Sequence, residues 1–183
     1  MNAPGFDVEW LKQRVRTVPD WPTTGVMFRD ITPLLQDALA LRALAEAFVQ
    51  RYRDARIALV AAIDARGFII GAVVAHQLAA GLIPIRKKGK LPAATIARNY
   101  ELEYGTGTIE MHVDAARAGE RVLLIDDLIA TGGTMLAACA LLDQLDVNIV
   151  ECAVVIDLPD LGGSCRLRDA GRRVFSLMEF AGH

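Results

Sequence analysis

Four short, almost wholly apolar runs constrain what this chain can fold into more than any other feature. They occupy residues 57–63, 82–85, 122–125 and 149–156. A run that is apolar at successive positions is typical of a strand buried on both faces, as in a parallel sheet. Segments with helical periodicity, residues 68–80 and 134–145, separate the first two runs and the last two. This alternation predicts an α/β fold in which a parallel, twisted sheet is flanked by helices.

The rest of the chain indicates a single domain, spanning residues 1–183. No internal repeat and no linker rich in Pro, Gly or Ser divides the 183 residues, and this length suits one domain. Apolar residues at helical spacing predict two N-terminal helices, at 6–17 and 37–53, with a loop at 18–24 after the first. Residues 89–113 break the alternation, so we expect a hairpin with a mobile connection there, a candidate lid.

Charge is balanced over the whole chain but not locally. Twenty basic residues face 22 acidic ones, and the net charge of −2 argues against an extended nucleic acid or an anionic membrane as partner. Three of the four lysines, Lys87, Lys88 and Lys90, nevertheless fall within four consecutive residues. The longest apolar run is too short to span a bilayer, and the first residues show no signal-peptide pattern.

The cysteines predict a compartment rather than a metal site. Cys139, Cys152 and Cys165 show no C-x-x-C spacing, and the three histidines are scattered, so a structural zinc site is not expected. We interpret the cysteines as buried thiols in a reducing compartment, which favours a cytoplasmic protein.

The most informative motif spans residues 122–134. An apolar strand leads directly into Asp126 and Asp127, and a small Gly/Thr loop then opens a helix. Open parallel sheets bind ligands at the carboxyl ends of their strands, and free N–H groups at a helix N-terminus bind phosphate. Paired carboxylates beside such a loop can accept hydrogen bonds from the vicinal hydroxyls of a ribose.

This motif therefore predicts a ribose-5-phosphate pocket, and the alternative interpretation is an ordinary helix cap. No Gly-Lys-Ser/Thr follows, so it is not a Walker loop. The residues assigned to the pocket are Asp126, Asp127, Ala130, Thr131, Gly132, Gly133 and Thr134.

The same stretch resembles the phosphoribosyl-diphosphate motif of the type I phosphoribosyltransferases. Further similar segments occur in the same order, namely WPTTGVMFRDITP at 21–33, ARGF at 65–68, IRKKGKLP at 85–92 and YELEYG at 100–105. The resemblance covers nearly the whole chain, and the Phe-Arg-Asp and Leu-Glu-Tyr-Gly segments resemble the adenine-specific branch of the family. It implies a type I phosphoribosyltransferase-like fold with a base-binding hood at residues 1–35 and a flexible lid loop within 89–113.

The activity that this resemblance implies is transfer of the 5-phosphoribosyl group from 5-phosphoribosyl 1-diphosphate (PRPP) to adenine. The products are AMP and pyrophosphate, and the reaction belongs to purine salvage. The resemblance also implies Mg²⁺, bound mainly through the diphosphate and ribose oxygens of the substrate rather than by a set of protein ligands.

Basic residues at two places are candidates for the pyrophosphate. Arg66 follows a predicted strand and offers a forked guanidinium to phosphate oxygens, and the resemblance places it in a pyrophosphate loop. Arg86, Lys87 and Lys90 end a strand before the candidate lid, which favours a pyrophosphate clamp. The alternatives are a surface arginine before a helix and a solvated charged face. In similar enzymes this basic region reaches into a neighbouring subunit, which implies a homodimer.

The hood supplies the candidate adenine site. Phe28 can stack on a purine, and the resemblance implies that the backbones of Val26 and Arg29 read the edge of the base. The alternative for Phe28 is an anchor between the N-terminal segment and the core.

The candidate lid supplies the candidate catalytic residues, Glu103 and Tyr104. The base nitrogen that attacks the anomeric carbon must lose a proton, which a carboxylate on a closing loop can accept. Glu101 competes for this role because residues 101 and 103 of a strand share one face. The resemblance favours Glu103, and an exposed acidic loop is the alternative.

Two other functions remain open. The protein could be a phosphoribosyltransferase for another base, such as a 6-oxopurine or orotate. It could also be a non-enzymatic regulator that keeps the pocket as a sensor, although 183 residues leave no room for a separate DNA-binding domain. The expected partners are adenine, PRPP and a second copy of the chain, with neither nucleic acid nor membrane.

Overall fold

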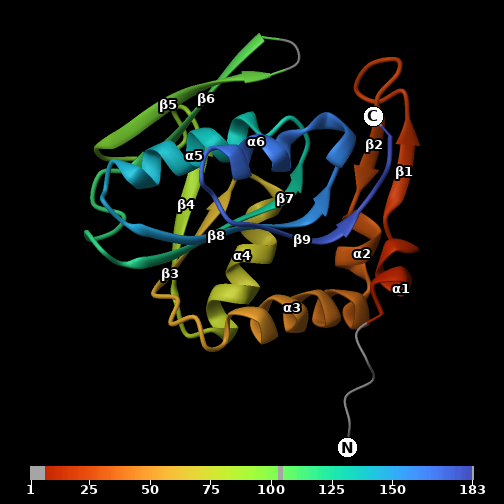
Figure 1. Cartoon of the computed structure of the whole chain (residues 1–183), viewed down its shortest axis with the longest axis horizontal. Helices are drawn as coiled ribbons and strands as arrows, with labels where there is room; N and C mark the ends of the chain where they lie inside the picture. Colours follow the sequence, from red (N-terminus) through yellow and green to blue (C-terminus); the bar gives the residue numbers. More distant parts are fainter. Residues whose placement is uncertain (1–6, 103–104, 183) are drawn as a thin grey trace, which may run out of the picture.

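A seven-stranded sheet runs through the centre of the structure, a computed structural model that describes residues 7–102 and 105–182 (Figure 1). Its strand order is β5-β6-β4-β3-β7-β8-β9. The consecutive pairs from β4 to β9 are parallel, whereas β5 and β6 form an antiparallel hairpin at one edge. The bounds are β3 (Leu59–Ile63), β4 (Gly81–Lys87), β5 (Thr95–Leu102), β6 (Gly105–His112), β7 (Arg121–Ile129), β8 (Asn148–Asp157) and β9 (Val174–Glu179).

Helices cover both faces of this sheet, which confirms the predicted fold class. Figure 1 shows α3 (Ala38–Tyr52) and α4 (Arg66–Gln77) on one face, and α5 (Gly133–Asp143) and α6 (Gly163–Asp169) on the other. Alternate residues of β7 enter two different cores: Leu123 and Ile125 join one, while Val122 and Leu124 join the other. Both faces of the strand are therefore dry, which is why its sequence is apolar without alternation.

The N-terminal segment differs from the sequence prediction. The helix expected over residues 6–17 is wrong beyond Lys12, because Arg16–Pro19 forms a strand instead. This strand pairs antiparallel with β2, and the Arg16 guanidinium bonds to the Asp30 carboxylate, with Nη2 and Oδ2 2.6 Å apart. Helical spacing cannot reveal a partner fourteen residues away. The elements here are α1 (Val8–Lys12), β1 (Arg16–Pro19), β2 (Met27–Asp30) and α2 (Thr32–Gln36).

Two boundaries near the site also differ from the prediction. Strand β7 extends to Ile129, so Asp126 and Asp127 lie inside the strand rather than after its end. Helix α4 begins at Arg66, two residues before the expected start at 68. The short elements after β8, namely η1 (Pro159–Leu161), α6 and β9, were not predicted, because segments this short show no clear periodicity.

The thiols are free, but not all of them are buried. Cys139 on α5 and Cys152 on β8 are buried, with their Sγ atoms 3.5 Å apart. Cys165 is exposed on α6, so the expectation that it is buried is wrong: α6 covers the sheet through Leu167, and Cys165 lies on its solvent side. Among the helices of residues 7–102 and 105–182, none has the length and apolar character needed to cross a membrane.

Candidate active site

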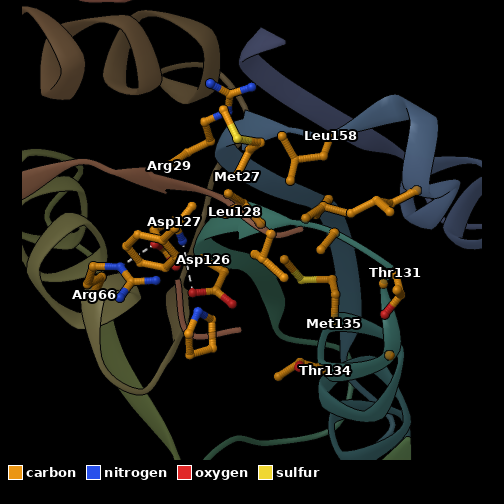
Figure 2. Close-up of a pocket in the computed structure, with 18 of the residues that line it drawn as sticks. Met27, Arg29, Arg66, Asp126, Asp127, Leu128, Thr131, Thr134, Met135 and Leu158 are labelled. Carbon is orange, nitrogen blue, oxygen red and sulfur yellow. Dashed lines mark hydrogen bonds and ion pairs between the residues drawn. The ribbon is translucent and has the colours of Figure 1, made fainter. Parts of the chain in front are cut away.

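A cavity of about 960 Å³ opens at the carboxyl edge of the parallel strands, between the β1–β2 sheet and the start of α5 (Figure 2). It brings together most of the residues predicted from the sequence, although they come from distant parts of the chain. Those that line it are Val26, Phe28, Arg29, Arg66, Asp126, Asp127, Ala130, Thr131, Gly132, Gly133 and Thr134.

The loop of residues 130–134, here called the phosphate loop, is built to receive an anion. Gly132 adopts a left-handed conformation (φ +81°) and precedes α5 without a side-chain cap. The first N–H groups of a helix have no partner within it, so they remain available to a ligand. Thr131 and Thr134 add hydroxyl groups beside them (Figure 2). Together these donors and the positive end of the helix dipole suit a phosphate group.

Asp126 and Asp127 are adjacent on β7 but have different surroundings. The buried Asp127 forms an ion pair with the Nε of Arg66, whereas Asp126 accepts the N–H of Asp127 on Oδ1 at 2.8 Å. Figure 2 shows Arg66 reaching Asp127 with Asp126 beside them. Burial, followed by the neighbouring Asp127 carboxylate, raises the pKa of Asp126 well above its usual range. This favours the protonated form of Asp126, which can donate as well as accept a hydrogen bond, more than in an ordinary aspartate.

Arg66 reaches this pair because α4 begins very close to β7. The peptide bond between Asp64 and Ala65 is cis, and α4 starts at the next residue. A methyl group at Gly67 would lie 3.0 Å from Oδ1 of Asp126 and 3.1 Å from the carbonyl oxygen of Ile125. Glycine thus allows the close approach that places the guanidinium at the cavity.

The sheet formed by β1 and β2, here called the hood, forms the opposite wall. Phe28 is half-buried, its ring centroid lies 4.3 Å from that of Trp21, and the Arg66 guanidinium lies 5.4 Å from it. The side chain of Arg29 instead contacts the C-terminal segment, where it donates to the carbonyl oxygen of Ala181 at 3.0 Å. Figure 1 shows the C-terminus beside β1 and β2. If Arg29 contacts the edge of the base, it would therefore do so through its backbone atoms.

The sequence analysis missed an apolar part of the cavity. Leu158 follows the end of β8, and Leu161 lies in η1. The rule that directed attention to the carboxyl end of β7 applies equally to β8, so Leu158 could have been found. Apolar side chains facing Phe28 suit a planar, uncharged ring. The other apolar lining residues are Met27, Leu128, Ile129 and Met135.

The structure does not bring the basic cluster into the cavity lining. Lys87 and Lys90 are exposed. The Arg86 guanidinium lies 3.5 Å from the Asp64 carboxylate and donates to the carbonyl oxygen of Lys90 at 2.9 Å. In the chain as described, these residues therefore lie outside the cavity lining.

The turn that carries the lysines is held by Glu110 on β6. Its carboxylate accepts the backbone N–H groups of Lys90 at 2.9 Å and of Leu91 at 3.0 Å. These donors, that of Leu91 foremost, lower the pKa of Glu110. The turn is therefore held through its backbone.

The predicted catalytic residues Glu103 and Tyr104 lie outside the described residues, and so does the side chain of Glu101. The structure therefore leaves the choice between Glu101 and Glu103 open. Strands β5 and β6 pair in register from Thr95↔His112 to Leu102↔Gly105. Across residues 7–102 and 105–182, no cluster of three or more His, Cys, Asp or Glu side chains could hold a metal ion.

Comparison with known proteins agrees with this geometry. Residues 31–172 match the family model of the phosphoribosyl transferase domain, and the chain belongs to that family. It is 60% identical over 174 residues to the adenine phosphoribosyltransferase of Cupriavidus necator, covering 95% of this chain and 92% of the relative.

Solved structures extend the likeness to the fold. The crystal structure of adenine phosphoribosyltransferase from Rhodothermus marinus superposes with a TM-score of 0.89 at 47% identity, covering 94% of this chain and 98% of that one. The enzyme from Saccharomyces cerevisiae, solved with D-2,5-dideoxy-2,5-imino-altritol 1,6-bisphosphate and adenine, gives a TM-score of 0.88 at 34% identity, covering 93% and 98%. The resemblance noted in the sequence is confirmed.

Proposed function

We propose that this protein transfers the 5-phosphoribosyl group of PRPP to adenine, giving AMP and pyrophosphate, as an enzyme of purine salvage. The observation that carries this proposal is one cavity with two chemically opposite walls. The phosphate loop and the two aspartates suit a phosphorylated ribose, while Phe28 and Leu158 suit a planar base. Relatives named for this activity support it, and the yeast relative was solved with adenine.

The wall formed by the end of β7 and the phosphate loop, here called the core-built wall, binds the phosphoribosyl group in this proposal. Residues 130–134 hold the 5-phosphate through backbone N–H groups and threonine hydroxyls. Asp126 and Asp127 hold the ribose hydroxyls, and Asp126 is the freer of the two because Asp127 is paired with Arg66. An incoming diphosphate competes with Asp127 for the Arg66 guanidinium, so that binding of the substrate loosens this pair.

The proton is removed by Glu103, assisted by Tyr104, on the lid within residues 89–113. Closure of the lid and the apolar hood keep water from the cationic sugar that forms as pyrophosphate leaves. Glu101 is the competing base. The proposal for Glu103 rests on the family resemblance of the segment YELEYG.

We also propose that Mg²⁺ enters with the substrate. This ion favours phosphate oxygens and waters over a set of protein ligands, so the diphosphate and ribose oxygens of the substrate would supply most of its ligands. Bound there, Mg²⁺ would offset the charge of the diphosphate and so make pyrophosphate a better leaving group. Removing the ion with EDTA is expected to abolish turnover, and adding Mg²⁺ back is expected to restore it.

The protein acts as a homodimer in which Arg86, Lys87 and Lys90 complete the diphosphate site. Their position outside the cavity lining of one chain supports sharing between subunits. Mixing two variants that are expected to bind PRPP weakly, Asp127→Asn and Lys87→Ala/Lys90→Ala, and assaying them at a low PRPP concentration tests the sharing. If the lysines serve the partner's site, mixed dimers contain one intact site and regain activity, whereas lysines that act within their own chain give no gain.

The free thiols at Cys139, Cys152 and Cys165 fit a reducing compartment, so we place the protein in the cytoplasm, acting on small molecules without nucleic acid or membrane.

Turnover of adenine, hypoxanthine, guanine and orotate with PRPP tests the function directly. We expect adenine to be the strongly preferred base. Turnover of another base with none of adenine would make the protein a different phosphoribosyltransferase. Binding of PRPP without turnover of any base would make it a regulator.

A further inference from the structure

The segment that follows β8 donates hydrogen bonds to two consecutive carbonyl groups of the phosphate loop. Gly163, at the start of α6, donates its N–H to the carbonyl oxygen of Ala130 at 3.1 Å. Arg166, one turn further along α6, donates from Nη1 to the carbonyl oxygen of Thr131 at 2.8 Å. The backbone of the loop is therefore held from α6 as well as by its own connection to α5.

The two segments are so close that glycine is required on both sides. A methyl group at Gly163 would lie 2.2 Å from the carbonyl oxygen of Ala130 and 2.6 Å from the nitrogen of Gly132. In return, a methyl group at Gly132 would lie 2.9 Å from the carbonyl oxygen of Gly163, and the φ of +81° at Gly132 also favours glycine. The two facing glycines set the distance between α6 and the loop.

Arg166 controls the direction of a peptide group in the loop. The carbonyl of Thr131 and the N–H of Gly132 belong to one planar peptide unit, so holding the carbonyl also fixes the N–H. A charged donor at the carbonyl further polarises this unit and strengthens its N–H as a donor. Arg166 thus adds order and positive charge to the loop.

Arg166 also lies next to the hairpin that leads to the candidate lid. A second cavity, of about 290 Å³, lies between β5 and α5, and Arg166 lines it together with Gly133 of the phosphate loop. Arg98, Asn99 and Tyr100 of β5 line the same cavity. The guanidinium is therefore placed between the phosphate loop and the edge hairpin.

We propose that Gly163 and Arg166 form a brace that shapes the phosphate loop for the 5-phosphate of the phosphoribosyl substrate. They are positioning residues, because they act through the backbone of Ala130 and Thr131. The inference rests on the proposed function, since it takes PRPP as the ligand of the loop. It goes beyond that function by assigning part of the PRPP affinity to α6.

The first test replaces Arg166. We expect Arg166→Ala to raise the Kd for PRPP about five- to tenfold, as for one charged hydrogen bond lost at a partly solvated site, with the KM for adenine within about twofold of wild type. Arg166→Lys keeps one charged donor and is expected to recover part of the affinity. Arg168→Ala, at an exposed arginine of the same helix, is the matched control and is expected to bind PRPP like the wild type. Titration calorimetry with Mg²⁺ present measures the PRPP affinity, and steady-state kinetics measures the KM for adenine.

The second test adds a methyl group at Gly163, where it would collide with the carbonyl oxygen of Ala130. Gly163→Ala is expected to weaken PRPP binding more than Arg166→Ala does, and its melting temperature shows whether the fold is kept. The Arg166 variants carry the test if Gly163→Ala does not fold.

The brace is disproved if wild type turns over adenine while Arg166→Ala binds PRPP within twofold of it, or if the affinities for adenine and PRPP fall together. A wild-type protein that neither binds PRPP nor turns over adenine overturns the proposed function itself, and the brace with it.

Discussion

The two walls of the cavity are built in different ways. The phosphate loop continues a buried strand, β7, into a helix, α5, so its position follows from the core of the protein. The hood is a separate two-stranded sheet whose side chains tie it to the rest, as Arg29 does at Ala181. The hairpin β5–β6 is also an antiparallel ribbon, but β6 pairs with β4, so the hairpin forms the edge of the central sheet.

This difference separates two tasks under the proposed function. The core holds the phosphate and ribose that every phosphoribosyl transfer needs, whereas the hood, together with Leu158, contacts the base and the hairpin carries the group that accepts its proton. A ribbon attached mainly by side chains, as the hood is, can change its contacts without disturbing the sheet. The following experiments examine this division, in order of decreasing expected effect.

The hairpin is expected to carry the chemical step. Glu103→Gln removes the proposed base and is expected to lower kcat about 10²- to 10⁴-fold, while the affinity for PRPP stays the same. Steady-state kinetics and calorimetry measure the two quantities. Glu101→Gln is the matched control, and a loss there with Glu103→Gln near wild type would reverse the assignment.

Asp127→Asn attacks the core-built wall. It removes the charged acceptor proposed for the ribose hydroxyls, and this loss outweighs the release of Arg66 from its ion pair, so we expect PRPP to bind about ten- to hundredfold more weakly, with little change in the KM for adenine. Asp143→Asn breaks another Asp–Arg pair, with Arg172, at the far end of α5 and serves as control. Equal losses in both variants would contradict a specific role of Asp127.

Arg29→Met loosens the hood. It removes the hydrogen bond to Ala181 and the contact with the Phe180 ring, 4.9 Å from the guanidinium, so we expect the KM for adenine to rise about three- to tenfold. The affinity for PRPP is expected to change less than about twofold, because contacts at separate sites contribute independently to binding. A parallel loss of PRPP affinity would show that the walls are coupled.

Acid is expected to release the hood before the sheet unfolds. Burial alone would raise the pKa of Asp30, but hydrogen bonds from Thr32 and Arg16 lower it from 3.8 to about 2. A carboxyl group whose pKa is lowered by folding stabilises the folded state at pH values above its ordinary pKa. For Asp30, this stabilisation is lost as the pH falls from 3.8 to about 2.

The fluorescence of Trp21 in the hood, recorded in a Trp10→Phe background, follows this release, and circular dichroism follows the sheet. Asp30→Asn is expected to make the fluorescence insensitive to pH in this range. Coincident transitions of the two signals would mean that the hood and the sheet unfold as one unit.

The same contrast explains how far the sequence could be interpreted. The apolar strands and the motif of Asp126, Asp127 and residues 130–134 were predicted because a strand buried on both faces and the loop after it carry local signals. Strand β1 of the hood was missed because it depends on a distant partner: the apolar spacing through Val15 continues a helical period, and the strand is evident only from its pairing with β2, including Arg16 with Asp30.

The contribution of α6 could not be predicted for a similar reason. Gly163 and Arg166 matter because of the atoms of the phosphate loop that they meet, about thirty residues earlier in the chain. In sequence terms they are an ordinary glycine and one arginine among sixteen. The basic cluster was recognised as charged, but charge alone does not say whether a side chain enters a cavity or surrounds it.

The way in which Glu110 holds its turn has a consequence for the speed of substrate capture. This carboxylate bonds to the backbone of Lys90 and Leu91, and the side chains of Lys87, Lys88 and Lys90 are exposed. The field of exposed charges reaches about 8 Å at physiological ionic strength and shrinks as salt is added. The rate at which an anionic substrate is drawn in should therefore fall with ionic strength, whereas the contacts of the phosphate loop, made at hydrogen-bond distance, keep their strength once the substrate has arrived.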